Sequence, residues 1–121
     1  MKVELSKRLR SVVRDLAAKA YEREMRALLS PLAKDFVNWR TGRKDTWALL
    51  DALDRFAVPR RRLSQRYETS TIAPMTVAYA IVVGLLREDE VPAEVLDALE
   101  KPIAFYRQGF TDGTVAIEEE D

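Results

Sequence analysis

Residues 4–29 read ELSKRLRSVVRDLAAKAYEREMRALL and contain no glycine or proline. Apolar side chains recur in this segment at spacings that place them on one stripe of an α-helix. The stripe consists of Leu5, Leu9, Val12, Leu16, Ala20 and Leu28, and Val13, Ala17 and Tyr21 widen it. Most of the remaining side chains are Lys, Arg or Glu. The segment therefore predicts a long amphipathic N-terminal helix.

A second, shorter helix is expected directly after this segment. Ser30 and Pro31 are typical of an N-cap residue followed by the first residue of a helix. The predicted helix covers residues 31–40, and Gly42 is well placed to end it. Its apolar face consists of Leu32, Phe36 and Trp39. Whether it continues the first helix after a kink is left open by the sequence.

A third helix is predicted over residues 46–57. Asp45 is a favourable N-cap, and Val58-Pro59 should end the helix. Its apolar side chains cover more than one stripe, so we expect packing on two sides; they are Trp47, Leu49, Leu50, Leu53 and Phe56. Residues 60–68 are polar and fit either a short helix or a loop.

A fourth helix, over residues 75–87, is apolar on nearly every side and should lie at the centre of the core. Its small residues Ala78, Ala80 and Gly84 would let a neighbouring helix approach closely.

Proline positions organise the last helical region. Pro92 is expected in its first turn, with Glu94 near the positive end of the helix dipole. Pro102 disfavours helical geometry at Lys101, so a break is predicted there, followed by a short helix through Gln108.

These segments predict an all-α protein, a bundle of four to six helices with a long N-terminal helix. The chain has 121 residues, of which 47% are hydrophobic and 33% charged, which suits one folded domain. We assign residues 1–110 to a single helical domain and residues 111–121 to a short acidic C-terminal tail, which is expected to be disordered.

The apolar segments also bear on location. Charged residues interrupt the N-terminus too early for a signal peptide. The longest apolar run, residues 72–86, is shorter than the about 20 residues of a membrane span. A cytoplasmic location without membrane contact is expected.

The chain contains no cysteine and no histidine. Their absence excludes Ser-His-Asp and Cys-His catalysis, disulfides and zinc fingers. Asp51 and Asp54 share a helix face and could hold a hard cation, but no further ligand can be named beside them. We therefore predict a protein that is not an enzyme and that uses no cofactor or metal.

The formal net charge of zero hides a strong asymmetry between the two halves of the chain. Residues 1–66 hold 17 Lys and Arg against 8 Asp and Glu, a net charge of +9. Residues 67–121 hold 3 basic and 12 acidic residues, a net charge of −9. Three interpretations stay open: the halves face each other within the fold, they meet between copies, or the basic half contacts nucleic acid.

Basic side chains concentrate at two places. Arg40, Arg43 and Lys44 surround Gly42 just before a predicted helix N-terminus, where an anion could bind. An ordinary polar turn explains this group more simply. The second group consists of Arg60, Arg61, Arg62 and Arg66, with Tyr67 beside it. Arginine suits phosphate contacts, but one tyrosine among four arginines is weak support for a nucleic-acid platform.

A helix-turn-helix formed by residues 31–57 is rejected as a DNA reader. The candidate recognition helix, residues 46–57, offers Asp51, Asp54 and Arg55 outward, and acidic side chains read base edges poorly. Any nucleic-acid contact should therefore be made to the phosphate backbone and depend on salt.

The functional hypothesis is a non-enzymatic helical interaction protein, either a homo-oligomer or an accessory subunit of a larger complex. The candidate interface is the apolar stripe of the first helix with two aromatic residues: Leu5, Leu9, Val12, Leu16, Tyr21 and Phe110. The alternative is a sequence-nonspecific nucleic-acid-binding accessory protein that uses the arginine-rich half. A small antitoxin, immunity or phage-type regulator fits the size and charge balance, but no motif points to one.

Overall fold

The computed structural model describes residues 3–68 and 73–113, and every element in this part of the chain is helical. The order is α1 (Lys7–Arg40), α2 (Thr46–Arg66), α3 (Ala73–Val83), a 3₁₀ turn η2 (Glu88–Glu90), α4 (Ala93–Ala98) and α5 (Glu100–Asp112). The all-α prediction with a long first helix is confirmed. Residues 114–121 of the predicted tail lie outside the described residues.

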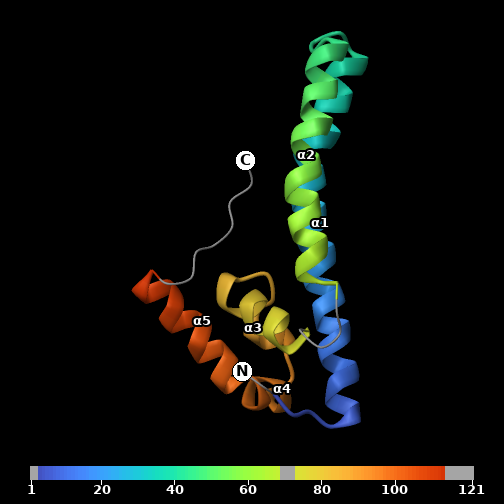
Figure 1. Ribbon diagram of the computed structural model, residues 1–121. Coiled ribbons are helices and arrows are strands. Elements are labelled where there is room, and N and C mark those ends of the chain that lie inside the picture. Colours follow the sequence, from blue (N-terminus) through green and yellow to red (C-terminus); the bar gives the residue numbers. More distant parts are fainter. Residues whose placement is uncertain (1–2, 69–72, 114–121) are drawn as a thin grey trace.

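Two parts of different shape share helix α1. Helices α1 and α2 run antiparallel as a long hairpin, while α3 and α4 pack against the N-terminal half of α1 and α5 packs on α3 (Figure 1). We call this second part the base, and we call residues 29–60 of α1 and α2 the distal hairpin. Figure 1 shows the distal hairpin projecting beyond the base.

The hydrophobic core lies in the base. Val13, Leu16 and Ala20 of α1 pack against α3, whose residues are buried on nearly every side. Ala78 and Ala80 are fully buried, as their small size suggested, and allow close helix contact. Helices α4 and α5 and the segments that lead into them close the core with Leu86, Val91, Val95, Leu99 and Ile103. The central position predicted for the fourth helix is therefore confirmed.

The structure settles the open question at Pro31, where the helix continues, and the helix end predicted at Pro59 is wrong. Pro31 lies inside α1, and the hydroxyl of Ser30 donates to the Arg26 carbonyl at 2.7 Å instead of capping a new helix. Pro59 lies inside α2, which continues to Arg66 and makes residues 60–66 helical. A proline costs an isolated helix about 3 kcal/mol. Here both prolines line the groove between α1 and α2, and the packing of the two helices against each other along the hairpin offsets that cost.

The other helix ends follow local chemistry more closely. Asp45 caps α2 by accepting the backbone N–H of Ala48 at 2.8 Å, as predicted. Gly42 follows the end of α1 in the left-handed region, with φ of 81°. Gly84 does the same after α3, with φ of 87° and no heavy atom near the place of a Cβ. It therefore ends the helix at Val83 and does not serve close helix packing, which corrects that prediction.

The last helical region is divided slightly differently from the prediction. Pro92 is the N-cap of α4, one residue before its first turn. The break near Pro102 occurs at Leu99, so Pro102 lies in the first turn of α5, where a missing N–H is tolerated. Helix α5 continues past Gln108 to Asp112.

Ion pairs join the basic and acidic halves in the base. Arg23 of α1 binds both carboxylate oxygens of Glu90, at 2.7 and 2.8 Å, and also donates to the Leu85 carbonyl. The backbone N–H of Arg87 donates to Glu90 as well. The Arg23 hydrogen bonds, followed by this N–H, lower the pKa of Glu90 to about 2. Arg8 and Glu94 form a second, exposed pair between the halves. Part of the charge asymmetry is thus compensated within the fold.

Candidate interaction surface

The predicted interface on the first helix is used inside the chain. Leu16 belongs to the core, and Leu5, Leu9 and Val12 pack against it. Tyr21 makes an edge-to-face contact with Tyr67, with ring centroids 5.3 Å apart. Phe110 of α5 lies 6.2 Å from the ring of Tyr79 in α3. These side chains therefore have a packing role within one copy, and their role in an interface stays a prediction.

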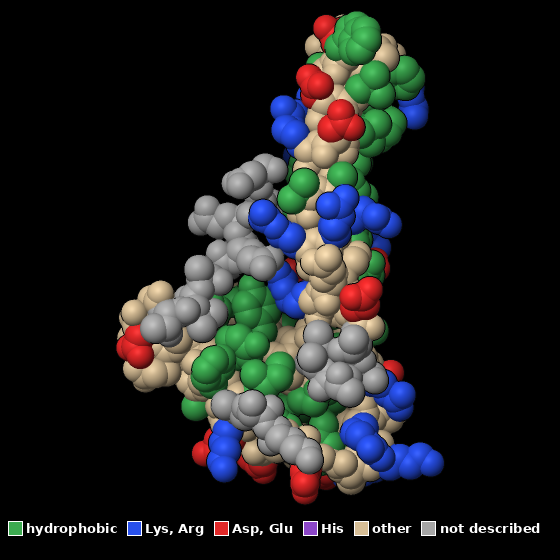
Figure 2. Space-filling model, in the orientation of Figure 1, with side chains coloured by type: hydrophobic (Ala, Val, Ile, Leu, Met, Phe, Trp, Pro, Cys, Tyr) green, Lys and Arg blue, Asp and Glu red, His purple; other side chains and the backbone are tan. Residues whose placement is uncertain are grey.

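Exposed apolar side chains gather on the distal hairpin. Of the eight large hydrophobic residues exposed in residues 3–68 and 73–113, all but Phe105 lie there: Leu29, Phe36, Val37, Trp39, Trp47, Leu50 and Val58. Trp47 is 78% exposed and Leu50 is 44% exposed. Figure 2 shows hydrophobic side chains along this part of the molecule. The third predicted helix, residues 46–57, was expected to pack on two sides, but among the described residues this part of α2 packs against α1.

Several of the exposed apolar residues come directly after residues that face the contact between α1 and α2. Leu28 and Leu32 of α1 line the contact with α2, as do Ala52 and Phe56 from the other side. Each residue of a helix is rotated by about 100° from the one before it. In an antiparallel pair this rotation carries the following residues of both helices to the same flank. That flank, which we call the hairpin face, consists of Leu29, Ala33, Phe36, Leu50, Leu53 and Ala57.

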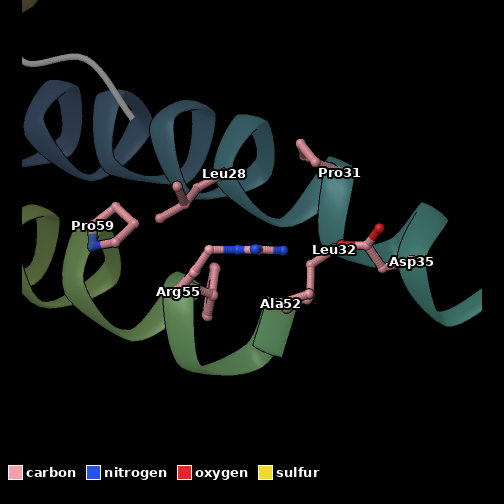
Figure 3. Close-up of a pocket in the computed structure, with 8 residues that line it drawn as sticks. Leu28, Pro31, Leu32, Asp35, Ala52, Arg55 and Pro59 are labelled. Atoms are coloured by element: carbon pink, nitrogen blue, oxygen red, sulfur yellow. The ribbon is translucent and has the colours of Figure 1, made fainter. Parts of the chain in front are cut away.

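The opposite flank of the hairpin is different in character. It holds a groove of about 250 Å³ between α1 and α2. Pro31, Asp35, Arg55 and Pro59 are among its lining residues, and the Arg55 side chain lies along it (Figure 3). The hairpin thus has one mainly apolar flank and one flank that carries charged groups.

The turn at the hairpin tip is fixed by side-chain hydrogen bonds. The indole Nε1 of Trp39 donates to Thr46 Oγ1 at 3.1 Å and joins the two helices. Lys44 forms an ion pair with Asp35 at 2.7 Å. Of the first predicted basic group, Arg40 and Arg43 are exposed, while Lys44 is half-buried and already holds a carboxylate.

The second predicted basic group is divided by the structure. Arg60, Arg61 and Arg62 are exposed on successive positions of α2, so they point in different directions around the helix. Arg66 instead binds Glu24 at 2.8 Å and lies over the ring of Tyr79, 5.0 Å from its centroid. The two basic groups are about 25 Å apart along α2, from the 1.5 Å rise per residue. The structure therefore does not bring them together into one anion site.

Arg66 and its neighbours anchor the lower end of α2 to α1. The hydroxyl of Tyr67 donates to Glu24 at 2.7 Å, so one carboxylate serves both residues. Burial is the main cause that raises the pKa of the Tyr67 hydroxyl, and the Glu24 contact adds to it. This network is a structural role for two residues that the sequence had placed near a nucleic-acid site.

Sequence reasoning missed the hairpin face, although a signal was present. Phe36, Trp39 and Trp47 had been placed only on the apolar faces of the second and third predicted helices. The extra apolar stripe of the third predicted helix, Leu50 with Leu53, was the feature that could have located the face.

No group of three or more metal-ligating side chains occurs among the described residues. In the same part of the chain, no helix combines the length and the hydropathy needed to cross a bilayer. Comparison with protein-family models, with curated proteins and with solved structures finds no match.

Proposed function

We propose that this chain is a non-enzymatic interaction protein that binds a protein partner through the hairpin face. The observation that supports the proposal is the exposure of Phe36 and Leu50 on one flank of a hairpin that projects beyond the base. Contiguous exposed apolar side chains mark interaction sites more often than chance solvent exposure does. The base would hold the hairpin in place, and the face would supply the binding energy.

The kinds of side chain exposed on the hairpin support a protein partner. Aromatic side chains are common among the few residues that carry most of the energy of protein interfaces, and this hairpin exposes Phe36, Trp39 and Trp47. Nucleic-acid binding is the weaker candidate, because Lys44 and Arg66 already bind carboxylates and the remaining arginines are spread along the hairpin.

Photocrosslinking tests this proposal in the native cells. A photoreactive phenylalanine analogue is placed at Phe36 or at Leu50, and at Lys101 of α5 as an exposed control on the base. We expect the same protein to be crosslinked from both hairpin positions and not from position 101. An additional Leu53→Ser substitution should remove that product. Equal products from the base and the hairpin, or none from the hairpin, would contradict the proposal.

A further inference from the structure

We infer that the partner segment bound by the hairpin face is an acidic amphipathic helix. This inference rests on the proposed function and specifies the chemistry of its ligand. Three observations support the inference: the charges at the ends of the hairpin face, the length of the face, and the antiparallel arrangement of its two helices.

Arginine bounds the hairpin face at both ends. Arg40 lies next to the tip, four positions after Phe36 in α1. This spacing places it on the same flank as Leu29, Ala33 and Phe36. Arg60 lies three positions after Ala57 in α2 and so continues the hairpin face at its lower end. The face is thus apolar in the middle and positive at each end.

These terminal charges are not neutralised within the part of the chain that the structure describes. Arg40 and Arg60 are exposed and pair with no described carboxylate, whereas Arg26, Lys44 and Arg66 each have one. The distal hairpin, residues 29–60, holds six Lys and Arg against four Asp and Glu, a net charge of +2. Asp54 is two positions before the inward-facing Phe56, so it points to the back of α2, away from the face. A ligand with carboxylates at its ends would therefore meet complementary charge.

The dimensions of the face fit a short helix. Leu29 to Arg40 and Leu50 to Arg60 each span about 15 Å, or about three helical turns. Two antiparallel helices offer a shallow groove along their shared flank, and a third helix packs into such a groove at about 8–10 Å from each axis. Its apolar anchors would follow the i, i+3, i+4, i+7 spacing.

A second copy of the chain fits the same face poorly. If two hairpin faces met in antiparallel orientation, Arg60 of one copy would lie against Arg40 of the other. In parallel orientation each arginine would lie against its own counterpart. Both arrangements place like charges together at both ends of the face, which is unfavourable. The charges therefore favour a different, acidic partner.

Binding of designed peptides to the full chain tests the inference. The probe is a stapled helix of about 15 residues with leucine at the anchor positions and glutamate elsewhere, because stapling removes the cost of helix formation. The comparison peptide carries lysine in place of glutamate, and a single-stranded oligonucleotide of similar charge is the third probe. Fluorescence anisotropy measures each affinity.

We expect the glutamate peptide to bind at least about tenfold more tightly than the lysine peptide, and Leu50→Ser to weaken that binding by about tenfold or more. The double variant Arg40→Glu/Arg60→Glu should reverse the preference between the two peptides. Arg62→Glu is the matched control, because Arg62 is also exposed but precedes the buried Leu63 and so lies on the opposite flank. Helical circular dichroism and an unchanged unfolding midpoint show that the variants fold.

Several results would overturn the inference. Equal affinity for both peptides would remove the role of charge, and an Arg62→Glu effect as large as that of the double variant would remove the role of the face. Preferential binding of the oligonucleotide would point to nucleic acid. A dimer that dissociates on Leu50→Ser would identify a second copy as the occupant. If crosslinking from Phe36 and Leu50 succeeds while the peptide preference is absent, the proposed function stands and only the acidic chemistry fails.

Discussion

Replacing Leu99 with alanine should lower the free energy of unfolding by about 2–5 kcal/mol. Leu99 is fully buried and lies at the junction of α4 and α5, in contact with the core that joins both helices to α1 and α3. The substitution removes three buried carbon atoms, Cγ and the two Cδ methyls. It leaves a cavity that the surrounding helices close only partly. Because domains are stable by about 5–15 kcal/mol, this is a large fraction of the total. Urea unfolding of both proteins measures the difference.

Leu50→Ala is the matched control for this prediction. It deletes the same atoms from a side chain that is 44% exposed on the hairpin face. The expected loss is no more than about 1 kcal/mol, since substitutions at the surface have small effects on stability. Similar losses in the two variants would mean that the base is not the stable core of the molecule.

The second large effect concerns Glu90 and depends on pH. Arg23 and the Arg87 N–H lower the pKa of Glu90 from 4.5 to about 2 in the folded chain. A lowered folded pKa means that the carboxylate stabilises the fold at pH values above about 4.5, and that this contribution is lost as the pH falls toward about 2. Glu90→Gln should therefore lower the urea midpoint at neutral pH, and the difference from the unchanged protein should disappear near pH 2.

Glu94→Gln provides the control at an exposed ion pair of the same region. The side chains of Glu94 and Arg8 are both more than half exposed, and such pairs contribute about 0–1 kcal/mol. Its urea midpoint should follow that of the unchanged protein across the pH series. If Glu90→Gln behaves like Glu94→Gln, the Arg23–Glu90 contact does not join α1 to the base in the way described.

Local chemistry explains the features that the sequence predicted correctly. The carboxylate of Asp45 satisfies a free backbone N–H at the start of α2, and Gly42 adopts a backbone conformation that is costly for other residues. Both effects depend on a few neighbouring residues. For the same reason the all-α class and the central position of α3 followed from apolar spacing alone.

The continuous helices across Pro31 and Pro59 could not be predicted in this way. Both prolines line the same groove between α1 and α2, so each helix supports the other at the point where it lacks a backbone donor. That support comes from residues about 28 positions away in the chain. Rules for helix ends consider only neighbouring residues, so they predict a break at each proline.

The hairpin face was not located from the sequence, because the apolar pattern does not distinguish buried from exposed leucines. Leu49 and Leu50 are adjacent and equally apolar, and only the position of α1 makes the first buried and the second exposed. A helix with two apolar stripes indicates two packing partners, but the spacing does not say whether both belong to the same chain. The sequence therefore indicated surplus apolar surface, but the residues that it proposed for the interface pack in the base, and the exposed stripe lies on the distal hairpin.

The most direct test of the central claim compares serine substitutions at these two adjacent leucines. Leu49 is 5% exposed and Leu50 is 44% exposed, and both lie on α2. For each variant, urea unfolding gives the stability and the crosslink from Phe36 gives partner binding. We expect Leu49→Ser to destabilise the hairpin, whereas Leu50→Ser should keep the free energy of unfolding within about 1 kcal/mol and lose the crosslinked partner. A Leu50→Ser variant that unfolds as readily as Leu49→Ser, or that keeps its partner, would contradict the claim.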